Sequence, residues 1–473
     1  MKRIIETGIN KTLLDLSWEE TDFIVEHPSD LSRGDYSTNV AMLLSKELDR
    51  SSVDIAHEIK DKLEGSLEGV ERVEVAGPGF INFYLSKEFF GKRLEEILGD
   101  TDTFGRRTLL KGEKKIIEYT DPNIFKEFHI GHVMSNTIGE AVSRLLEWNG
   151  AEVKRACYQG DTGMHVAQAM WALLKNNSHP TGELFKDAQT LGNAYVEGTK
   201  AVEVERDDIR ALNKMIHEKA DKKVNAMYEE WKKVSLQYFD YFYNILGTKF
   251  DYFFFESETG KVGKDIVEKN VGQIFEQSEG AVVFHAESYD PALHTRVFIN
   301  SEGIPTYEAK ELGLAKVKYD KYSYDQSIVV TGNEIKEYFK VILAAMKFVY
   351  PELREKTKHL PHGMMRLPTG KMSSRTGDVI TANELLGEVK KSIADKGDTA
   401  QEEIAVGAIK YMILRQSIGN DIIFDIEKSV STEGDSGVYL QYAYARATSL
   451  VEKASGVKVN LKSEEDTHEV EHL

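Results

Sequence analysis

The chain has 473 residues, of which 41% are hydrophobic and 29% charged, so it should form more than one globular domain. Its formal net charge of −18 argues mildly against a nucleic-acid partner, although phosphates need only a local group of lysines and arginines. A single cysteine, Cys157, excludes a disulfide framework and a multi-cysteine zinc site, and the lack of a membrane-length apolar run or an apolar signal core predicts a cytoplasmic protein with no membrane partner.

Residues 1 to about 110 predict a separate α+β domain. Helical patterns near 9–16 and 51–64 flank the segment 34–39, and a Pro-Gly turn separates two alternating segments at 73–76 and 80–84. Two alternating segments around such a turn predict a β-hairpin. The residues alone also allow another interpretation, in which this domain is a structural appendage whose glycines make turns.

The stretch 116–132 is the centre of the sequence. Its apolar, β-prone start predicts a buried strand that Pro122 ends, and the amphipathic run after it, at 133–148, predicts a helix. His129 and His132 therefore stand at a helix N-terminus, where free N–H groups and the helix dipole bind anions. With Lys126 nearby this arrangement predicts a phosphate site, although His-Ile-Gly-His alone is more often a pair of surface histidines.

A second strand, at 153–158, leads into Gly160, Asp161 and Gly163. Strands that alternate with helices predict a parallel sheet whose ligands lie at the carboxyl ends of the strands. We therefore expect Asp161 to border the site, without assigning it a firm role.

Residues 176–270 interrupt this alternation with a helix-rich, charged segment that becomes strongly aromatic. Its apolar residues recur at helical spacing, which favours a buried core over a base-stacking platform. The residues concerned are Tyr238, Tyr241, Phe242 and Ile245.

Beyond the insertion, strands are predicted at 281–284 and 296–300, and 327–334 predicts a buried strand that runs into a site loop. A glycine-bounded loop follows at 370–377, and 381–430 is mostly helical. That loop reads Gly-Lys-Met-Ser-Ser-Arg-Thr-Gly.

The histidine stretch and the lysine loop, in this order and this far apart, resemble the paired signatures of class I aminoacyl-tRNA synthetases. The pattern from Glu118 to His132 is similar to that of the arginyl-tRNA synthetases in particular. The segments 34–39 and 77–83 resemble the N-terminal domain of that family, which touches the outer corner of the tRNA, and 437–446 resembles the start of its anticodon-binding bundle.

The resemblance implies an α/β fold: a Rossmann-type parallel-sheet catalytic domain, an α+β N-terminal domain and the start of a C-terminal helical bundle. We expect the N-terminal domain at 1–110 and the catalytic domain at 111–380, with its insertion at about 176–270. A helical connecting region should follow at 381–430, and a truncated bundle at 431–473. The rest of the bundle could then belong to a separate polypeptide.

The implied reaction joins L-arginine to ATP, accompanied by Mg²⁺ without a dedicated protein metal site, and passes the arginyl group to the terminal ribose of tRNA. The implied catalytic residues are Lys126, His129, His132 and Lys371. The implied ATP-binding residues are His129, Gly131, His132, Lys371, Met372 and Ser373. Ser374 stands where the family usually has a second lysine, and Lys126 is expected to supply that charge from the opposite side.

Arginine recognition requires carboxylates, because guanidinium is a permanent cation with five donors. The resemblance places Glu118 and Asn123 on the substrate, and Tyr307 and Glu311 against the guanidinium. Glu311 stands where the family usually has Asp. The family's glutamine near the next strand end has no clean match among 333–335, and Thr162 and His165 replace its usual Trp and Gln.

Three alternatives remain open at the level of the sequence. One is a class I synthetase of another specificity, against which Glu118, Glu311 and the N-terminal domain argue. Another is a synthetase-derived, non-catalytic tRNA-binding protein, against which the intact signature residues argue. The third is a small-molecule adenylyltransferase, but such chains are far shorter and lack the flanking domains.

Overall fold

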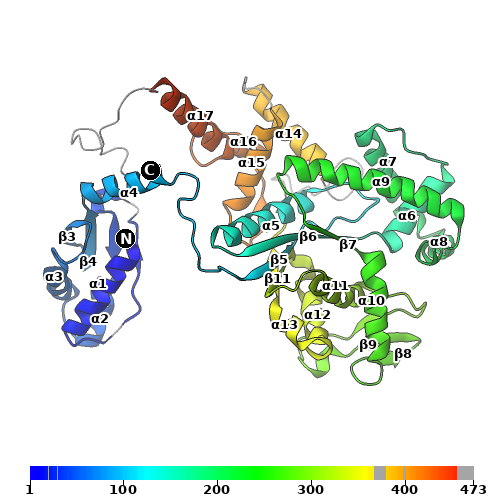
Figure 1. Ribbon diagram of the computed structural model, residues 1–473, viewed down its shortest axis with the longest axis horizontal. Coiled ribbons are helices and arrows are strands. Elements are labelled where there is room, and N and C mark those ends of the chain that lie inside the picture. The colour runs from blue at the N-terminus through cyan, green and yellow to red at the C-terminus, as the bar shows by residue number, and fades with distance from the viewer. Residues whose placement is uncertain (20, 29, 367–379, 398–400, 455–473) are drawn as a thin grey trace. The chain divides into compact units, whose positions relative to one another are not determined.

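The computed structural model describes the chain except residue 20, residue 29, 367–379, 398–400 and 455–473. The described residues form two compact units, Met1–Gly105 and Arg106–Ala454 (Figure 1). The predicted lysine loop, with Lys371, Met372 and Ser373, lies outside the described residues.

The first unit is built on a four-stranded antiparallel sheet in the order β1-β2-β4-β3. The predicted hairpin is confirmed, since β3 and β4 pair antiparallel across the turn that contains Gly79. Ile5 and Ile59, from two of the helices, are fully buried with Phe83 of β4, which fixes the helices to one face of the sheet. The elements are α1 Lys2–Asp15, β1 Val25–Glu26, β2 Tyr36–Thr38, α2 Val40–Leu48, α3 Ser52–Leu63, β3 Val70–Ala76, β4 Phe80–Leu85 and α4 Lys87–Gly99.

The second unit is organised around a five-stranded parallel sheet in the order β12-β11-β5-β6-β7. In chain order, β5, β6 and β7 extend the sheet to one edge, and β11 and β12 are then added on the other side of β5. β5 and β11 are therefore the switch point at which a doubly wound sheet opens a crevice for ligands. The strands are β5 Lys114–Glu118, β6 Glu152–Gln159, β7 Tyr252–Phe255, β11 Gln326–Gly332 and β12 Thr357–His362.

Both faces of this sheet are buried, which explains its continuous apolar strands. Ile116 and Ala156 face Leu314 of α11, whereas Ile117 and Cys157 pack with the helices of the other face. The helices that flank the sheet are α5 Ile130–Trp148, α6 Met164–Lys175, α10 Glu256–Lys269, α11 Tyr307–Lys321, α12 Lys336–Val349 and α13 Pro351–Lys356.

The insertion between β6 and β7 is helical, with α7 Leu184–Ala201, α8 Arg206–Glu218 and α9 Lys222–Ile245. The prediction of a core role for its aromatic stripe is confirmed: Tyr238 and Phe242 are buried, and the Phe242 ring stacks on Phe128 at 4.8 Å between centroids. The stripe thus holds α9 against the loop that carries the two histidines.

The predicted strands 281–284 and 296–300 do not join the parallel sheet. They form a small antiparallel sheet of β8 Glu276–Ser278, β9 Ala281–Phe284 and β10 Arg296–Ile299. Toward the C-terminus the described chain forms the strand pair β13 Met365–Arg366 with β14 Ile422–Ile423, and the helices α14 Ala382–Asp395, α15 Glu402–Leu414, α16 Ile426–Ser429 and α17 Gly437–Lys453.

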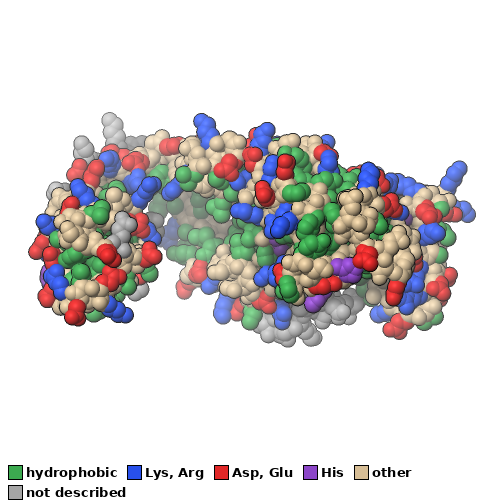
Figure 2. All heavy atoms as spheres, turned by 90° about the horizontal axis from the view of Figure 1, so that it is seen from below, with side chains coloured by type: hydrophobic (Ala, Val, Ile, Leu, Met, Phe, Trp, Pro, Cys, Tyr) green, Lys and Arg blue, Asp and Glu red, His purple; other side chains and the backbone are tan. Residues whose placement is uncertain are grey.

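Charges of both signs are interspersed on the face drawn in Figure 2, so this face carries no large field of a single sign. Of the helices in the described ranges, none is long and apolar enough to cross a membrane.

Candidate active site

A cavity of about 650 Å³ opens at the carboxyl ends of β5 and β11, at the switch point of the sheet. Its lining combines the start of α5, the start of α11 and the ends of four strands. Seven of the residues predicted to form the site line it: Glu118, Asn123, His129, Gly131, His132, Tyr307 and Glu311. Residues distant in sequence thus meet in one space.

The two histidines form the N-terminal cap of α5. His129 Nδ1 accepts a hydrogen bond from the Gly131 N–H at 3.1 Å, and His132 Nδ1 accepts one from the His129 N–H at 3.1 Å. The rings stack with centroids 3.6 Å apart. A Cβ on residue 131 would lie 3.0 Å from the His129 ring, so glycine permits this cap.

This geometry fixes the tautomers of both rings. Burial and the nearby Lys126 charge lower the pKa of His129 to about 4, and burial also lowers the pKa of His132, so both rings are neutral near pH 7. Because Nδ1 of each ring accepts, the proton is on Nε2. The pair therefore offers two neutral N–H donors, a suitable lining for phosphate oxygens that needs no imidazolium charge.

The loop between β5 and α5 is strained. Thr120 has φ 80 and Phe125 has φ 63, a region in which β-branched and bulky residues are outliers. The Thr120 N–H donates to Ser135 Oγ at 3.0 Å, and the Phe125 N–H donates to Ser235 Oγ at 3.0 Å. These bonds hold the loop in its unfavourable conformation, as is common where a loop must present groups to a ligand.

Glu118 ends β5, and its carboxylate forms a buried ion pair. It is 1% exposed, and the Lys318 ammonium of α11, 3% exposed, lies 2.6 Å from its Oε2. Lys318 also donates to Ser327 Oγ at 3.3 Å. Sequence patterning offered no sign of this partner, which lies two hundred residues away.

Tyr307 and Glu311 lie four residues apart on α11, so they share the helix face that lines the cavity. The described residues give the Glu311 carboxylate no hydrogen bond or ion pair. Burial and the adjacent Glu118 charge raise its pKa to about 8. Glu311 is thus a carboxyl group at one end of the cavity that has no ion-pair partner among the described residues.

Two further carboxylates line the cavity, and the sequence pointed to neither of them. Glu256 follows β7 directly and pairs with Lys310 at 2.5 Å, and Asp121 accepts a hydrogen bond from the Tyr158 N–H at 2.7 Å. Burial and the Glu118 charge raise the pKa of Asp121. The feature that could have identified Glu256 as a site residue is its position at the end of a parallel strand. Four carboxyl groups with two lysines leave this half of the cavity short of positive charge.

Arginine binding is expected to tighten as the pH rises from 7 to 9. Below its pKa of about 8 Glu311 is mostly protonated, and an incoming guanidinium must displace that proton; above it the charged carboxylate is ready. The dissociation constant for arginine, measured by calorimetry, should fall by about tenfold over this range. A flat profile would mean that Glu311 does not contact the guanidinium.

Lys126 is outside the described lining of the cavity. Its ammonium lies 4.3 Å from the centroid of the Tyr195 ring, and its charge reaches the two histidines and His165. Backbone hydrogen bonds join Phe128 to Ala382 and Ile130 to Ile380, so the histidine loop is tied to the residues that follow 367–379.

Asp161 does not face the central cavity. Its buried carboxylate is 2.7 Å from Lys232 Nζ and also accepts hydrogen bonds from Ser257. His165 is buried with Nε2 3.2 Å from the Gly160 carbonyl oxygen, whereas Glu334 lines the cavity. Asp161 and His165 therefore support the walls of the site.

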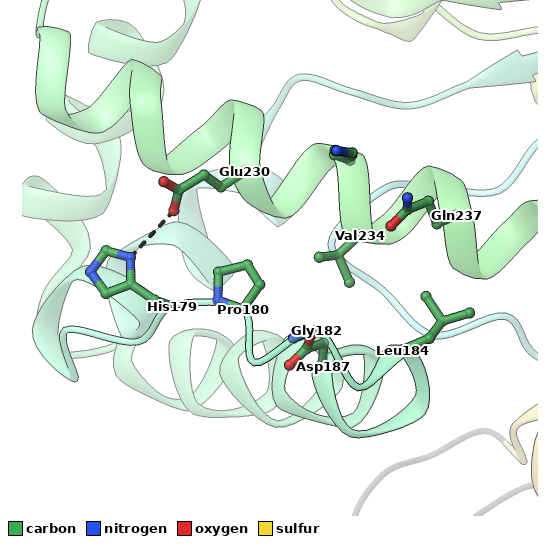
Figure 3. Close-up of a pocket in the computed structure, with 9 residues that line it drawn as sticks. His179, Pro180, Gly182, Leu184, Asp187, Glu230, Val234 and Gln237 are labelled. Carbon is green, nitrogen blue, oxygen red and sulfur yellow. Dashed lines mark hydrogen bonds and ion pairs between the residues drawn. The ribbon is translucent and has the colours of Figure 1, made fainter.

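Two other cavities lie nearer the insertion. One, of about 620 Å³, shares Glu256 with the central cavity and is lined by as many acidic as lysine side chains. The other, of about 390 Å³, lies between α9 and the start of α7 (Figure 3). There Glu230 faces His179 at 3.3 Å, and Asp187 accepts hydrogen bonds from Thr181, so both carboxylates have partners.

Comparison with known proteins gives consistent results along the chain. Residues 93–426 match the model of "tRNA synthetases class I (R), catalytic domain", and residues 1–85 match that of "Arginyl tRNA synthetase N terminal domain". The chain is similar to the arginine–tRNA ligase of Clostridium acetobutylicum, with 29% identity over 97% of this chain and 83% of that protein. With the arginine–tRNA ligase of Lactobacillus delbrueckii subsp. bulgaricus it shares 31% identity, over 96% of this chain and 81% of that protein.

Solved structures show the same fold. The arginyl-tRNA synthetase of Thermus thermophilus superposes with a TM-score of 0.73 at 23% identity, over 98% of this chain and 84% of that chain. The arginyl-tRNA synthetase of Plasmodium falciparum superposes with a TM-score of 0.67 at 19% identity, over 97% of this chain and 81% of that chain. At these identities the likeness concerns the fold alone.

Proposed function

Because the chain belongs to the arginyl-tRNA synthetase family of class I, we propose that the cavity between β5 and β11 is its arginine-activating site. The enzyme is an arginine–tRNA ligase that binds ATP, L-arginine and tRNA. The arginine carboxylate attacks the α-phosphate of ATP and pyrophosphate leaves; a hydroxyl of the terminal tRNA ribose then attacks the arginyl carbonyl and AMP leaves. One observation carries the assignment: neutral histidine donors and an acidic end with more carboxyl groups than lysines meet in one cavity.

The acidic end is proposed to hold the guanidinium. Glu311 supplies the unpaired carboxylate, with Tyr307 beside it and Glu256 opposite. Glu118 is paired with Lys318, so we propose that it acts on Glu311 through its charge and does not contact the guanidinium directly. Asn123 lies between this end and the histidines in the strained loop, where its amide suits the α-amino or carboxylate group of arginine.

The histidine end is proposed to hold the triphosphate. Attack at phosphorus develops charge on the phosphate oxygens, which preorganised donors stabilise without reorganising. Nε2–H of His129 and of His132 supply two such donors beside the positive end of the α5 dipole. Lys371, Met372 and Ser373 remain proposed on the family pattern. Mg²⁺ would arrive on ATP, and in the described ranges no group of three or more His, Cys, Asp or Glu side chains could hold it.

The remaining assignments rest on the family pattern. We propose that the first unit contacts the outer corner of the tRNA, and that α17 opens the part of the enzyme that faces the anticodon arm. We also propose that the enzyme works in the cytoplasm, where its three substrates meet.

ATP–pyrophosphate exchange, measured with each amino acid in turn and with or without tRNA, tests the function. Exchange should depend on arginine, and citrulline, the neutral analogue, should not replace it, because the acidic end requires a cation. Equal exchange with citrulline, or exchange that depends on another amino acid, would contradict the proposed site.

Lys126→Ala is expected to slow arginine activation by about 1 to 3 kcal/mol of transition-state stabilisation, with little change in arginine affinity. Lys126 is proposed to supply the charge that Ser374 does not. Lys175→Ala is a matched control, because Lys175 also lies over an aromatic ring, 4.5 Å from the Trp171 centroid, on the neighbouring α6. Pre-steady-state exchange rates that are the same for both variants and the unmodified enzyme would refute this role.

A further inference from the structure

Asp161, which follows β6 directly, is the centre of a buried polar cluster beside the central cavity. Its carboxylate lies 2.7 Å from Lys232 Nζ of α9 and accepts hydrogen bonds from the Ser257 N–H at 2.8 Å and the Ser257 hydroxyl at 2.7 Å. The Tyr228 hydroxyl of α9 donates to the Asp161 carbonyl oxygen at 2.9 Å. One residue therefore joins the end of β6, the start of α10 and the helical insertion.

The preceding residue, Gly160, contacts two polar side chains of the cavity. A Cβ at residue 160 would lie 1.9 Å from Asn123 Oδ1 and 3.4 Å from Glu256 Oε1. The Ile124 N–H donates to the Gly160 carbonyl oxygen at 3.0 Å, so the loop that carries Asn123 is paired with the end of β6. A larger residue would displace Asn123, and the backbone position of residue 160 therefore sets where that amide lies.

Ser257 connects the same carboxylate to Glu256. Ser257 follows Glu256 at the start of α10, so its two hydrogen bonds to Asp161 fix the backbone from which the Glu256 side chain extends. The Glu256 carboxylate is itself paired with Lys310 at 2.5 Å. Asn123 and Glu256 line the cavity, whereas Asp161, which positions both, is outside its described lining.

The counter-charge for Asp161 comes from the insertion. A buried carboxylate is costly unless it is paired and hydrogen-bonded, and Asp161 is 0% exposed. Lys232 supplies the pairing cation, and its ammonium also lies 4.3 Å from the ring centroid of Phe255, the last residue of β7. α9 is thus tied to the ends of the two strands that precede Asp161 and Glu256.

We propose that Asp161, held by Lys232 of the insertion, is a positioning residue for arginine binding. It acts without touching the substrate, through the Asn123 amide and the Glu256 carboxylate that its neighbours orient. Among the described contacts the cluster does not include the two histidines at the other end of the cavity, so its loss should weaken arginine binding and spare ATP. This role rests on the proposed arginine-activating function of the same cavity.

Asp161→Asn tests the role, because the amide keeps the size of the side chain but removes the charge that Lys232 compensates. The KM values for arginine and for ATP are measured separately in tRNA-dependent pyrophosphate exchange. Asp161→Asn should raise the KM for arginine by about tenfold and change the KM for ATP by less than about twofold. The dissociation constant for arginine, measured by calorimetry, should rise with the KM. Ser257→Ala removes one hydrogen bond to Asp161 and should cause a smaller rise.

Asp187→Asn is the matched control. Asp187 is 2% exposed, and its carboxylate accepts hydrogen bonds from the Thr181 and Gly182 N–H groups at 2.8 and 2.9 Å. It lies on α7, outside the described lining of the central cavity. Thermal unfolding should show a loss of stability in both Asp variants, but only Asp161→Asn should change the ratio of the two KM values.

Lys232→Met tests the link to the insertion. It leaves the Asp161 charge buried and unpaired, so it should raise the KM for arginine at least as much as Asp161→Asn does. In the double variant the amide needs no cation, so the two effects should not add. Tyr228→Phe, which removes the hydroxyl bonded to the Asp161 carbonyl, replaces Lys232→Met if that variant does not fold. Additive effects, or an unchanged KM for arginine, would show that the insertion does not act through Asp161.

Two results would overturn the role of Asp161 itself. One is an unchanged KM for arginine in Asp161→Asn, or in Ser257→Ala if Asp161→Asn does not fold. The other is an equal rise of the KM values for arginine and ATP, or the same rise for arginine in Asp187→Asn, because either would indicate a general loss of structure. Absence of any arginine-dependent exchange by the unmodified enzyme would instead contradict the proposed function.

Discussion

Glu311→Gln is expected to lower kcat/KM for arginine by roughly thirtyfold to several-thousandfold while leaving the KM for ATP nearly unchanged. The substitution keeps the shape of the side chain but removes a carboxyl group that has no ion-pair partner among the described residues. Losing one partner of a buried, charge-assisted pair costs about 2 to 5 kcal/mol, because the guanidinium is then held without its counter-charge. Steady-state ATP–pyrophosphate exchange at saturating ATP measures the ratio of kcat/KM for arginine between the unmodified enzyme and the variant.

The control for this variant lies on the same helix. Glu308→Gln neutralises a carboxylate 4.0 Å from Arg296 and outside the described lining of the cavity. Its charge acts on Glu311 less than that of Glu118, Lys318 or Glu256, so the variant should change arginine kinetics far less than Glu311→Gln does. Glu311→Gln should also narrow the discrimination between arginine and citrulline. Similar kinetics in the two variants would show that Glu311 does not bind the guanidinium. Glu256 would then be the carboxylate to test.

Lys318→Met is expected to lower the free energy of unfolding by about 3 to 5 kcal/mol, because it leaves Glu118 buried with its charge unpaired. Lys316→Met, two residues earlier, removes an exposed lysine paired with Asp320 and should have little effect. Urea unfolding of the two variants and the unmodified enzyme measures the difference.

The double variant Glu118→Gln with Lys318→Met separates stability from binding. Without the buried charge most of the lost stability should return, so the two effects should be strongly non-additive. Arginine affinity should change less than in Glu311→Gln, since Glu118 is neutralised in the unmodified enzyme as well. Additive losses of stability would show that the two side chains do not act as a pair.

The sequence predicted several elements of the site because their signals are local. The strand, the proline and the amphipathic run around His129 indicated a helix N-terminus, and α5 does begin at Ile130 with that histidine as its cap. The family resemblance placed Tyr307 and Glu311 together, and the two side chains share one face of α11. Helical periodicity likewise identified the aromatic core of α9.

What the sequence by itself determined is therefore the parallel-sheet architecture, the helix terminus that carries the histidines and the family pattern that names the substrates. Only the tertiary structure decided the electrostatics: that Lys318 pairs with Glu118, and that Glu311 has no ion-pair partner among the described residues. The physical reason is the distance along the chain over which each effect acts. Periodicity and capping act over a few residues, whereas charge and protonation depend on burial and on partners that folding brings from distant strands and helices.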